Sequence, residues 1–451
     1  MDSSKLRQVL LDLPSNAQEP IVGNIFIPYL LKLLDFDATE TVPKFATGNS
    51  FDAVDYAVRK NAENDIFVNT KSNPYLLLEI KGRDINLSGN SAQYRSAVKQ
   101  LHGYLRGSNC KSAQWGIITN SRHIQLFSKH GKVIHPASSC LEITPDNVDE
   151  IVAAIKAKID NPPRALTVAI YNNKGGVGKT TTTVNLAATL AAFGKQVLII
   201  DFDPNQQDLT NSLDVKPKED ALYSWLENKP SPSFPPGVMF RFSFPTKSTG
   251  TIAFDVIPSD KKLMVLGEER LRQVIRIAKL RQLIDPLKSL YDYILIDSPP
   301  NWRFFSQSAV YASDVVLIPT KHNNIFSLQN AAIVIKQFIP EVQSFRKDGG
   351  PIALPIFFNG EAITPAARAT ADRALDEIIE QAKNDKTNPF DLTPYFYSRY
   401  SQAKPDHYIF NLPSYAHIAN AAFARTPSVY RNKTAYDYYF ALAKEYFLQW
   451  A

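Results

Sequence analysis

The stretch of sequence that decides the fold is Lys174-Gly175-Gly176-Val177-Gly178-Lys179-Thr180-Thr181. It follows a short apolar run at residues 165–170, typical of a buried strand, and precedes a helical pattern from Thr181 to Ala192. The three glycines let the backbone wrap closely, so that successive N–H groups can point at phosphate oxygens. The helix N-terminus adds its partial positive charge. A glycine loop in this strand-to-helix context predicts a site for the phosphates of a nucleotide, and all eight residues are expected to line it.

Three side chains of this loop have separate expected roles. Lys179 is expected to reach the β- and γ-phosphates of ATP, and the Thr180 hydroxyl to complete the ligand shell of Mg²⁺. Thr181 is placed to contact the α-phosphate. The expected cofactors are therefore ATP and Mg²⁺.

Carboxylates follow two later strands of the same pattern. Asp201 and Asp203 come at the end of the apolar run 197–200, and Asp297 follows the run 293–296. Open α/β sheets bind their ligands at the carboxyl ends of the strands. Asp297 is expected to hold a magnesium-bound water, and Asp201 to lie near the metal. The alternative is a set of strand-end aspartates beside a glycine turn, and the ordered series of matching elements argues against it.

Apolar runs alternating with helical patterns define the larger part of the chain. A parallel sheet covered by helices on both faces requires such continuous apolar strands. The prediction is a doubly wound, mostly parallel sheet of the P-loop NTPase kind over residues 161–451. Its expected strands lie at 165–170, 197–200, 293–296, 315–318 and 352–358. A separate domain is expected over residues 1–160, because the helical pattern 148–159 ends at the paired prolines Pro162-Pro163.

Composition sets broad limits on function. The chain has 451 residues, of which 44% are hydrophobic and 21% charged, as expected for two or three globular domains. The formal net charge of +6 permits contact with nucleic acid without establishing it. No apolar run reaches the roughly 18 residues that a spanning helix needs, and the N-terminus lacks an export pattern. Two cysteines make no disulfide framework. The expected setting is cytoplasmic, away from membranes.

Residues 1–160 carry a second constellation. Glu79 and Lys81 end the apolar run 75–78 and project on one face of a strand, and Asp55, on a neighbouring strand, can meet them. Two carboxylates can bind a divalent ion, and a lysine can position or deprotonate an attacking water. Gln100 and Tyr104, one helical turn apart, are candidate catalytic partners. Two alternatives stay open: an ordinary α/β domain with a solvated Glu79–Lys81 pair, or a nuclease fold kept only to bind DNA.

The C-terminal part resembles the ParA/MinD partition ATPases. The resemblance rests on Lys174 at the start of the loop and on residues 201–206, 254–259 and 291–297; it is strong over about 165–340 and weaker over 418–447. It implies an ATP-dependent homodimer in which Lys174 reaches the partner's phosphates and Asp203 positions the attacking water. Asn205 departs from the family's usual glutamine, and no role is assigned to residues 321–324.

The N-terminal part resembles the PD-(D/E)xK nuclease domain of type I restriction motor subunits. The order Asp55, Glu79-x-Lys81 and Gln100-x-x-x-Tyr104 carries this resemblance, together with an opening helix predicted over residues 21–34. Val54 stands where that family usually has proline. The resemblance implies a restriction-endonuclease-like α/β fold and Mg²⁺-dependent DNA cleavage, with Asp55 and Glu79 as metal ligands.

Together these resemblances imply ATP-dependent action on DNA in a restriction-like or defence role. One alternative is a DNA segregation ATPase whose N-terminal domain is inactive and binds only DNA or a partner. Another is a regulatory switch acting on a further protein. The aromatic segment 436–450 has only Lys444 to offer a membrane surface, so it is expected to pack against the ATPase sheet.

Overall fold

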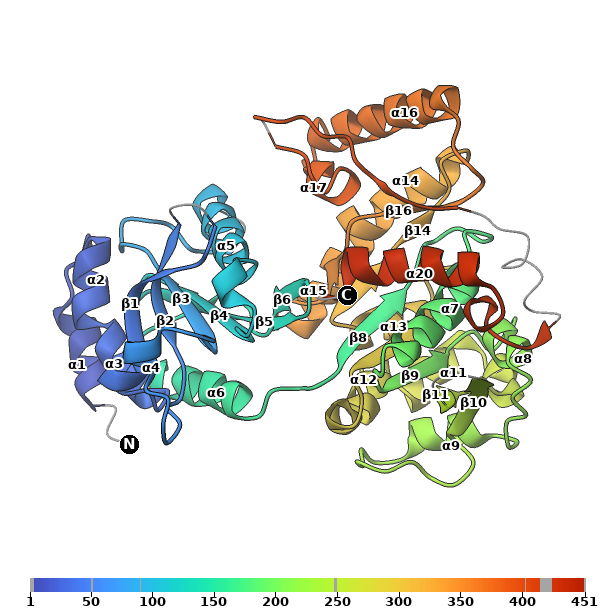
Figure 1. The fold of residues 1–451 in the computed structure, drawn as a ribbon, viewed down its shortest axis with the longest axis horizontal. Coiled ribbons are helices and arrows are strands. Elements are labelled where there is room, and N and C mark those ends of the chain that lie inside the picture. The colour runs from blue at the N-terminus through green and yellow to red at the C-terminus, as the bar shows by residue number, and fades with distance from the viewer. Residues whose placement is uncertain are drawn as a thin grey trace. The chain divides into compact units, whose positions relative to one another are not determined.

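The structure is a computed structural model that describes residues 4–49, 52–89, 91–246, 250–401, 403–413 and 424–449 (Figure 1). Of the segments quoted above, residues 418–423 and Trp450 lie outside these ranges. The chain divides into two compact units. Unit 1 comprises residues 1–162 with 347–350, and unit 2 comprises residues 163–346 with 351–451.

Unit 1 is built on a mixed sheet with the order β1-β2-β3-β4-β5-β6, and β7 pairs with β5. The first three strands form an antiparallel meander, and β4 runs parallel to β3 after a crossover through helix α5. The strands are β1 (Thr41–Ala46), β2 (Ala53–Val58), β3 (Leu76–Ile80), β4 (Trp115–Thr119), β5 (His123–His130), β6 (Val133–Pro136) and β7 (Leu141–Glu142). The helices are α1 (Ser4–Asp12), α2 (Glu19–Ile25), α3 (Ile27–Leu33), η1 (Ala38–Glu40), α4 (Phe67–Thr70), α5 (Ala92–Leu105), η2 (Ser108–Cys110) and α6 (Val148–Asp160).

Two apolar cores cover the two faces of this sheet. Leu76 and Leu78 of β3 join α1, α2, α3 and α6 in one core, and Leu77, pointing the other way, joins α4 and α5 in the second. This alternation is the period of a strand, so every residue of β3 is buried. Glu79 has the same parity as Leu77 and belongs to the α5 face.

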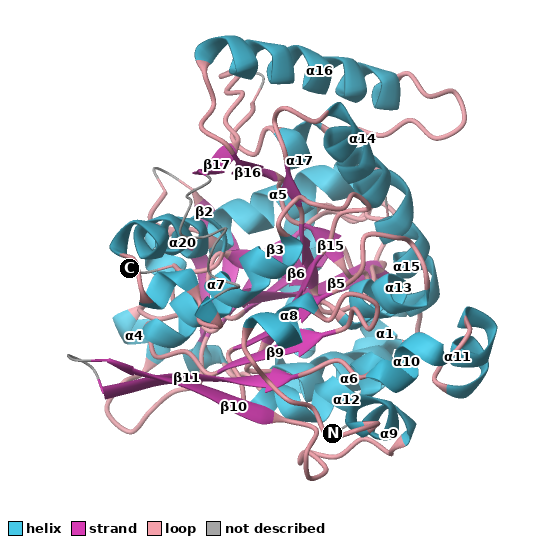
Figure 2. Cartoon of the chain, turned by 90° about the vertical axis from the view of Figure 1, so that its right-hand side faces the viewer, coloured by secondary structure: helices cyan, strands magenta, loops and turns pink. Residues whose placement is uncertain are grey.

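Unit 2 is built on a seven-stranded sheet with the order β10-β11-β9-β12-β8-β13-β15. All its pairings are parallel except that between β10 and β11, which form the long hairpin seen at the sheet edge in Figure 2. The strands are β8 (Leu166–Ile170), β9 (Val197–Asp201), β10 (Phe240–Thr246), β11 (Gly250–Ile257), β12 (Tyr293–Asp297), β13 (Val315–Leu317) and β15 (Ile352–Ala353). A small parallel sheet adds β14 (Pro319–Thr320), β16 (Phe357–Gly360) and β17 (Phe410–Pro413) in the order β14-β16-β17.

Helices follow the strands of unit 2 as a doubly wound fold requires. They are α7 (Lys179–Ala192), α8 (Asp208–Ser212), α9 (Ala221–Glu227), α10 (Lys261–Val265), α11 (Glu268–Val274), α12 (Lys279–Ile284), η3 (Asp285–Ser289), α13 (Phe304–Ala312), α14 (Ile325–Ile333), the π-helix η4 (Val334–Phe338), α15 (Ile339–Arg346), α16 (Pro365–Lys383), α17 (Thr393–Phe396), η5 (Ser428–Tyr430) and α20 (Lys433–Tyr446). Leu198 and Ile200 of β9 share one core with α9, α12 and α13. The fold is therefore mixed α/β with a mostly parallel P-loop sheet, as predicted.

Two predicted elements are wrong in detail, both because of proline. The run 352–358 is not one strand: β15 belongs to the large sheet and β16 to the small one. Pro355 lies between them and cannot donate to a ladder. The predicted helix 21–34 is two helices, α2 and α3, joined at Phe26 with Pro28 in the first turn of the second.

The C-terminal helix α20 lies along α7, the helix that follows the glycine loop (Figure 1). Its Phe440 stacks on Phe193 with ring centroids 4.8 Å apart, and Tyr439, Leu442 and Ala443 are buried. The expected packing of this segment is confirmed over the part that the structure describes. Within that part of the chain, no helix is both long and apolar enough to cross a lipid bilayer.

Candidate functional site

The order of the central strands brings the predicted loop and the aspartates of unit 2 to one edge of the sheet. Strand β12 lies between β8 and β9, and in the parallel register Asp297 stands level with Ile170 on one side and Asp201 on the other. The glycine loop leaves β8 immediately after Ile170. Since the chain turns to opposite sides after β8 and β12, this edge is the point where doubly wound sheets bind their ligands.

Two of the three loop glycines have a backbone that side chains rarely adopt. Gly176 and Gly178 have φ values of 72° and 83°. A Cβ on Gly178 would also lie 2.3 Å from Nδ2 of Asn359, whose amide donates to the Val177 carbonyl at 2.9 Å. Gly175 is outside the left-handed region, and a Cβ there would only contact Pro300 at 3.8 Å. Asn359 thus holds the loop closed against β16.

Lys179, the first residue of α7, is turned into this loop. Its side chain is buried, and Nζ donates to the carbonyl of Lys174 at 3.3 Å. Burial lowers the pKa of Lys179, whereas the nearby carboxylates of Asp297 and Asp203 act in the opposite direction. Lys174 supplies only its carbonyl to this arrangement; among the described residues, no ion pair involves its own ammonium group.

Thr180 and Asp297 meet directly. The Thr180 hydroxyl donates to Oδ2 of Asp297 at 2.6 Å, while the other oxygen, Oδ1, is buried without a hydrogen-bond partner among the described residues. Burial, followed by the charge of Asp201, raises the pKa of Asp297. A buried carboxylate oxygen without a donor is costly unless a cation satisfies it. The hydroxyl and carboxylate oxygens are hard ligands, so this pair suits Mg²⁺.

The two aspartates of the Asp-x-Asp segment differ in their surroundings. Both oxygens of Asp201 accept hydrogen bonds from the protein: Oδ1 from the Asp203 amide, and Oδ2 from the amide and hydroxyl of Thr210 at 2.9 and 2.6 Å. Among the described residues, Asp203 accepts only from the amides of Asn205 and Gln206, both through Oδ1. Burial raises the pKa of both carboxyls, to about 6 for Asp201. Asp201 therefore stabilises the segment that follows β9, because both of its oxygens bind protein donors. Asp203 has one oxygen that can bind a ligand.

Several residues that the sequence reasoning missed support this site. Asn172 donates to the carbonyls of Pro319 and Ser327, and Asn173 to Oδ1 of Asn330, which ties the loop to α14. Asn324, to which no role was assigned, accepts from the Ser327 amide and caps α14. Asn359 carried a visible signal, because it follows an apolar run just as the aspartates do.

Trp302 lies a few residues beyond Asp297 and belongs to the same edge. Its ring stacks on Phe338 of the π-helix η4 with centroids 4.3 Å apart and planes 1° from parallel. Its indole N–H donates to Glu341 at 3.1 Å. Its ring contacts that of Tyr171, with centroids 5.7 Å apart. Tyr171 is the first residue after β8. The loops after β8 and β12 thus share an aromatic contact.

The N-terminal constellation also lies together, within unit 1. Asp55 stands one residue beyond the last β2–β3 pair, Tyr56 with Leu78, and its Oδ2 accepts from the Ile80 amide at 2.7 Å. Lys81 is hydrogen-bonded to Oε1 of Glu79, whose side chain is almost fully buried. Burial, and then the charge of Asp55, raises the pKa of Glu79 to about 7, while Lys81 acts in the opposite direction.

Gln100 and Tyr104 both belong to α5 and contact each other. Gln100 donates to the Tyr104 hydroxyl at 2.6 Å. Burial is the main cause of the raised pKa of Tyr104, and the charges of Glu79 and Lys81 also act on it. Tyr104 therefore lies within electrostatic reach of the strand pair, and Gln100 is hydrogen-bonded to Tyr104.

Two further charged residues, Glu19 and Lys44, join the site and were missed from the sequence. Glu19 is the first residue of α2, and one of its oxygens lies 4.0 Å from Lys81 Nζ. Lys44 of β1 pairs with Oδ1 of Asp55 and lies 3.8 Å from Glu19. No sequence spacing links these positions to Asp55, because only the fold of the meander and α2 brings them there. In the described residues no group of three or more His, Cys, Asp or Glu side chains is arranged to hold a metal; here lysines bind the carboxylates.

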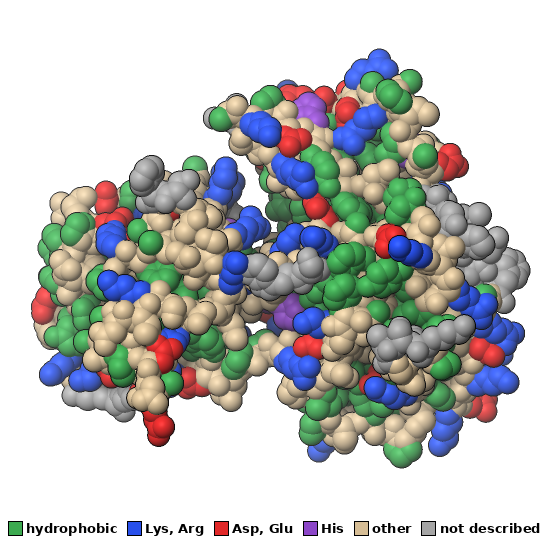
Figure 3. Space-filling view, in the orientation of Figure 1, with side chains coloured by type: hydrophobic (Ala, Val, Ile, Leu, Met, Phe, Trp, Pro, Cys, Tyr) green, Lys and Arg blue, Asp and Glu red, His purple; other side chains and the backbone are tan. Residues whose placement is uncertain are grey.

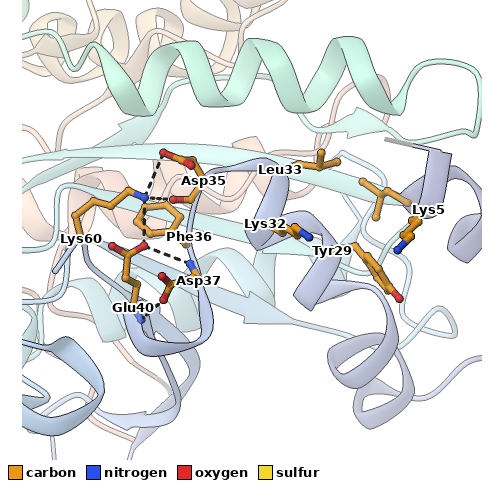
Figure 4. A pocket seen from close by; sticks show the side chains of 10 residues that line it. Lys5, Tyr29, Lys32, Leu33, Asp35, Phe36, Asp37, Glu40 and Lys60 are labelled. Atoms are coloured by element: carbon orange, nitrogen blue, oxygen red, sulfur yellow. Dashed lines mark hydrogen bonds and ion pairs between the residues drawn. The ribbon is translucent and has the colours of Figure 1, made fainter. Parts of the chain in front are cut away.

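Other charged features are less informative. A cavity of about 470 Å³ in unit 1 lies between α1, α3 and the turn at residues 35–40 (Figure 4). Its Lys60 is already neutralised by Asp35 and Glu40, and its lining includes none of the predicted site residues. On the face drawn in Figure 3, Lys and Arg side chains are spread over both units among other types. This face therefore does not mark out a nucleic-acid surface by its charge.

Comparison with known proteins bears on unit 2. The model of the AAA_31 family, described as an AAA domain, matches residues 165–349. The sporulation initiation inhibitor protein Soj of Bacillus subtilis (strain 168) is 36% identical over 156 residues, which are 34% of this chain and 57% of Soj. The chromosome partitioning protein ParA of Myxococcus xanthus is 35% identical over 155 residues, 34% of this chain and 50% of ParA. The chain thus spans about half the length of these curated relatives.

Solved structures give a looser likeness. An ATP complex of Cyanothece McdA aligns with a TM-score of 0.46 at 22% identity, covering 62% of this chain and 96% of that one. The septum site-determining protein MinD of Pyrococcus horikoshii, complexed with Mg-ADP, aligns with a TM-score of 0.41 at 20% identity, covering 62% and 95%.

Proposed function

We propose that unit 2, a P-loop domain of the ParA/MinD type, binds ATP with Mg²⁺ and hydrolyses it as a homodimer, and that unit 1 is a metal-dependent DNA nuclease domain. The observation that carries the first part is the contact of Thr180 with Asp297 beneath the glycine loop, with one buried Asp297 oxygen lacking a partner. Protein oxygens of this kind hold Mg²⁺ in P-loop ATPases.

The residues of unit 2 divide the work of hydrolysis between them. Lys179 would exchange the Lys174 carbonyl for the β- and γ-phosphates, while the amides of residues 175–180 and the α7 N-terminus bind phosphate oxygens. Thr180 and Asp297 would hold Mg²⁺, which neutralises charge on the phosphates when bound. Asp203, with its free oxygen, orients the attacking water. Lys174 of a second copy would stabilise the charge that develops on the γ-phosphate.

The nuclease proposal for unit 1 rests on the convergence of Asp55, Glu79 and Lys81 on the sheet face covered by α5. The antiparallel meander β1-β2-β3, the crossover α5 and the parallel strand β4 carry these groups as a PD-(D/E)xK fold would. Carboxylates of Asp55 and Glu79 suit a hard divalent ion. Lys81 would hold the water that attacks the phosphodiester, with Gln100 and Tyr104 orienting the strand being cut.

The test of the nuclease is cleavage of supercoiled plasmid with Mg²⁺ or Mn²⁺, with and without ATP. Cleavage by the wild-type chain that Glu79→Ala abolishes supports the proposal. Equal cleavage by Glu79→Ala points to a contaminating nuclease and contradicts it. ATP hydrolysis by the same preparations, lost in Lys179→Ala and retained in Glu79→Ala, tests unit 2 separately.

A second candidate function is DNA segregation, favoured by the curated relatives, one of which is named as a chromosome partitioning protein. In that case unit 1 is inactive and only binds DNA or a partner, and the lysines that pair with Asp55 and Glu79 remain in place. The distinguishing result is DNA binding without cleavage under every metal condition. A regulatory switch, in contrast, would hydrolyse ATP faster with a protein partner and respond little to DNA.

A further inference from the structure

We propose that Lys44 is the exchangeable counter-ion of the unit 1 site: it neutralises Asp55 until a divalent cation takes that carboxylate, and it then binds a phosphate of the DNA backbone. The inference rests on the proposed nuclease function and adds to it a residue that neither sequence motif contains. Its basis is the backbone, the exposure and the charge balance of Lys44.

The backbone at Lys44 has an unusual conformation. Lys44 has a φ of 45°, a left-handed value that a lysine rarely adopts, although its neighbours Pro43 and Phe45 both pair with β2 in regular antiparallel register. Lys44 is the one position skipped between them, level with Asp55. Strained positions of this kind persist where the surroundings impose them, and they cluster at functional sites. Here the strain accompanies the placement of the ammonium group between Asp55 and Glu19.

The two lysines of the site differ in how easily they can leave. The Lys44 side chain is 69% exposed, whereas that of Lys81 is 18% exposed and its partner Glu79 is almost buried. Both partner carboxylates are buried, since the Asp55 side chain is only 9% exposed, so each needs a cation beside it. A divalent cation can take that place at Asp55, because the ammonium group of the exposed Lys44 can move into solvent when it leaves. The Lys81 side chain is 18% exposed, so its ammonium group has less access to solvent and is held more firmly. Lys44 is therefore the mobile cation of the site and Lys81 the fixed one.

The charge balance of the site indicates that the released Lys44 binds a phosphate of the DNA. When all five groups are charged, the carboxylates of Glu19, Asp55 and Glu79 carry one more charge than Lys44 and Lys81 neutralise. A divalent cation reverses this balance to a single positive charge, and one phosphodiester then restores neutrality. The site is balanced with both ligands only if Lys44 stays within reach after leaving Asp55. Lysine is a common phosphate contact in protein–DNA complexes.

The first arm of the experiment measures Mn²⁺ binding by calorimetry on the full chain without nucleotide. Lys44→Met removes the competing ammonium group and is expected to tighten Mn²⁺ binding by roughly fivefold. Lys32→Met removes the same charge from an exposed position on α3 and is the matched control. Lys44→Gly also removes the ammonium group but accommodates the left-handed φ, so agreement between both Lys44 variants excludes an effect of misfolding.

The second arm measures binding of a short DNA duplex at several salt concentrations, with Ca²⁺ or with EDTA. With Ca²⁺, Lys44→Met is expected to weaken binding and to lower the salt slope by about one, the signature of one lost phosphate contact. With EDTA, Lys44 remains on Asp55, so the variant and the wild type should bind alike. The metal dependence of the loss separates this role from general surface charge, which Lys32→Met reports.

Unchanged or weaker Mn²⁺ binding in Lys44→Met, or an equal loss of DNA affinity with Ca²⁺ and with EDTA, overturns the role of Lys44. Glu79→Gln tells that failure from a failure of the nuclease itself. If Glu79→Gln abolishes Mn²⁺ binding, the metal site of unit 1 is supported, even when the Lys44 variants contradict the role proposed for Lys44. If Glu79→Gln leaves Mn²⁺ binding unaltered, unit 1 has no such site, and both proposals are wrong.

Discussion

Lys179 and Lys174 share one hydrogen bond in this structure yet have different predicted roles. Lys179 is buried and aimed into the loop, so Lys179→Ala should remove the main cationic contact to the phosphates. We expect nucleotide affinity to fall by at least about 100-fold, as the loss of two charged hydrogen bonds implies. Lys174→Ala is the control, expected to keep binding and to lose hydrolysis. Fluorescent-nucleotide titration measures both; similar affinity of Lys179→Ala and the wild type would contradict the assignment.

Asp203 differs from Asp201 in that one of its oxygens has no donor in the part of the chain that the structure describes. Asp203→Ala should leave ATP binding intact while removing the group that orients water, so ATP-bound dimers should accumulate. Size-exclusion chromatography with ATP and Mg²⁺ measures this. A monomeric Asp203→Ala chain under these conditions would count against the dimer.

The buried Glu79 predicts a pH dependence of stability in unit 1. Its pKa rises from an ordinary value of 4.5 to about 7 in the fold, so between these values the folded chain holds a proton that the unfolded chain has lost. Stability therefore falls as pH rises from about 4.5 to 7, by about 3 kcal/mol in all, and is level above pH 7. Glu79→Gln should abolish that part of the profile.

Urea unfolding without added metal, at pH 5 and pH 8, tests this. The glutamine variant should be more stable than the wild type at pH 8 and nearly equal at pH 5. Glu63→Gln removes an exposed carboxylate from the same unit and is the matched control. A parallel pH profile for the wild type and Glu79→Gln would contradict the prediction.

At the scale of elements, the glycine loop offers an internal comparison. Gly178→Ala places a Cβ in the left-handed region and against Asn359, at a cost of about 1–2 kcal/mol for the backbone alone. We expect it to distort the start of α7 and to weaken ATP binding at least tenfold. Gly175→Ala meets neither obstacle and should bind nearly as the wild type does. Isothermal titration calorimetry with ATP measures the affinity of both variants. Equal affinities of Gly178→Ala and Gly175→Ala would contradict the prediction.

The elements also show how far the sequence could predict the fold. Continuous apolar runs identified β8, β9, β12 and β13 because both faces of these strands are buried. The hairpin partner β10 was missed, although Phe240, Phe242 and Phe244 alternate with polar residues as in a half-exposed strand. The break at Pro355 depends on which sheet each half joins, a tertiary choice that the run of apolar residues does not record.

At the scale of the whole molecule, each unit has its own apolar cores. We expect two unfolding transitions in calorimetry, one for each unit. ATP with Mg²⁺ should stabilise only the transition of unit 2, by about 2.7 kcal/mol at a hundredfold excess over Kd. Lys179→Ala should abolish that shift and leave both transitions in place. A single transition that moves as one with ATP would show that the units unfold together.

The same scale explains which site residues the sequence could not indicate. Asp55, Glu79 and Lys81 lie on or next to neighbouring strands, so their spacing and order in the sequence indicated that they form one site. Glu19 and Lys44 reach the site from α2 and β1, and nothing in their local sequence distinguishes them from other surface charges. Asn359 likewise reaches the glycine loop across some 180 residues of chain.

Trp302 gives the protein a built-in optical probe. The indole lies against Tyr171 and Phe338, and the neighbouring Pro300 faces Gly175 of the loop that would close around phosphates. Any rearrangement of that loop alters the surroundings of the indole, and hence the colour and intensity of its emission. Replacing the other three tryptophans by phenylalanine would leave a chain in which nucleotide occupancy can be followed by stopped-flow fluorescence without an attached dye.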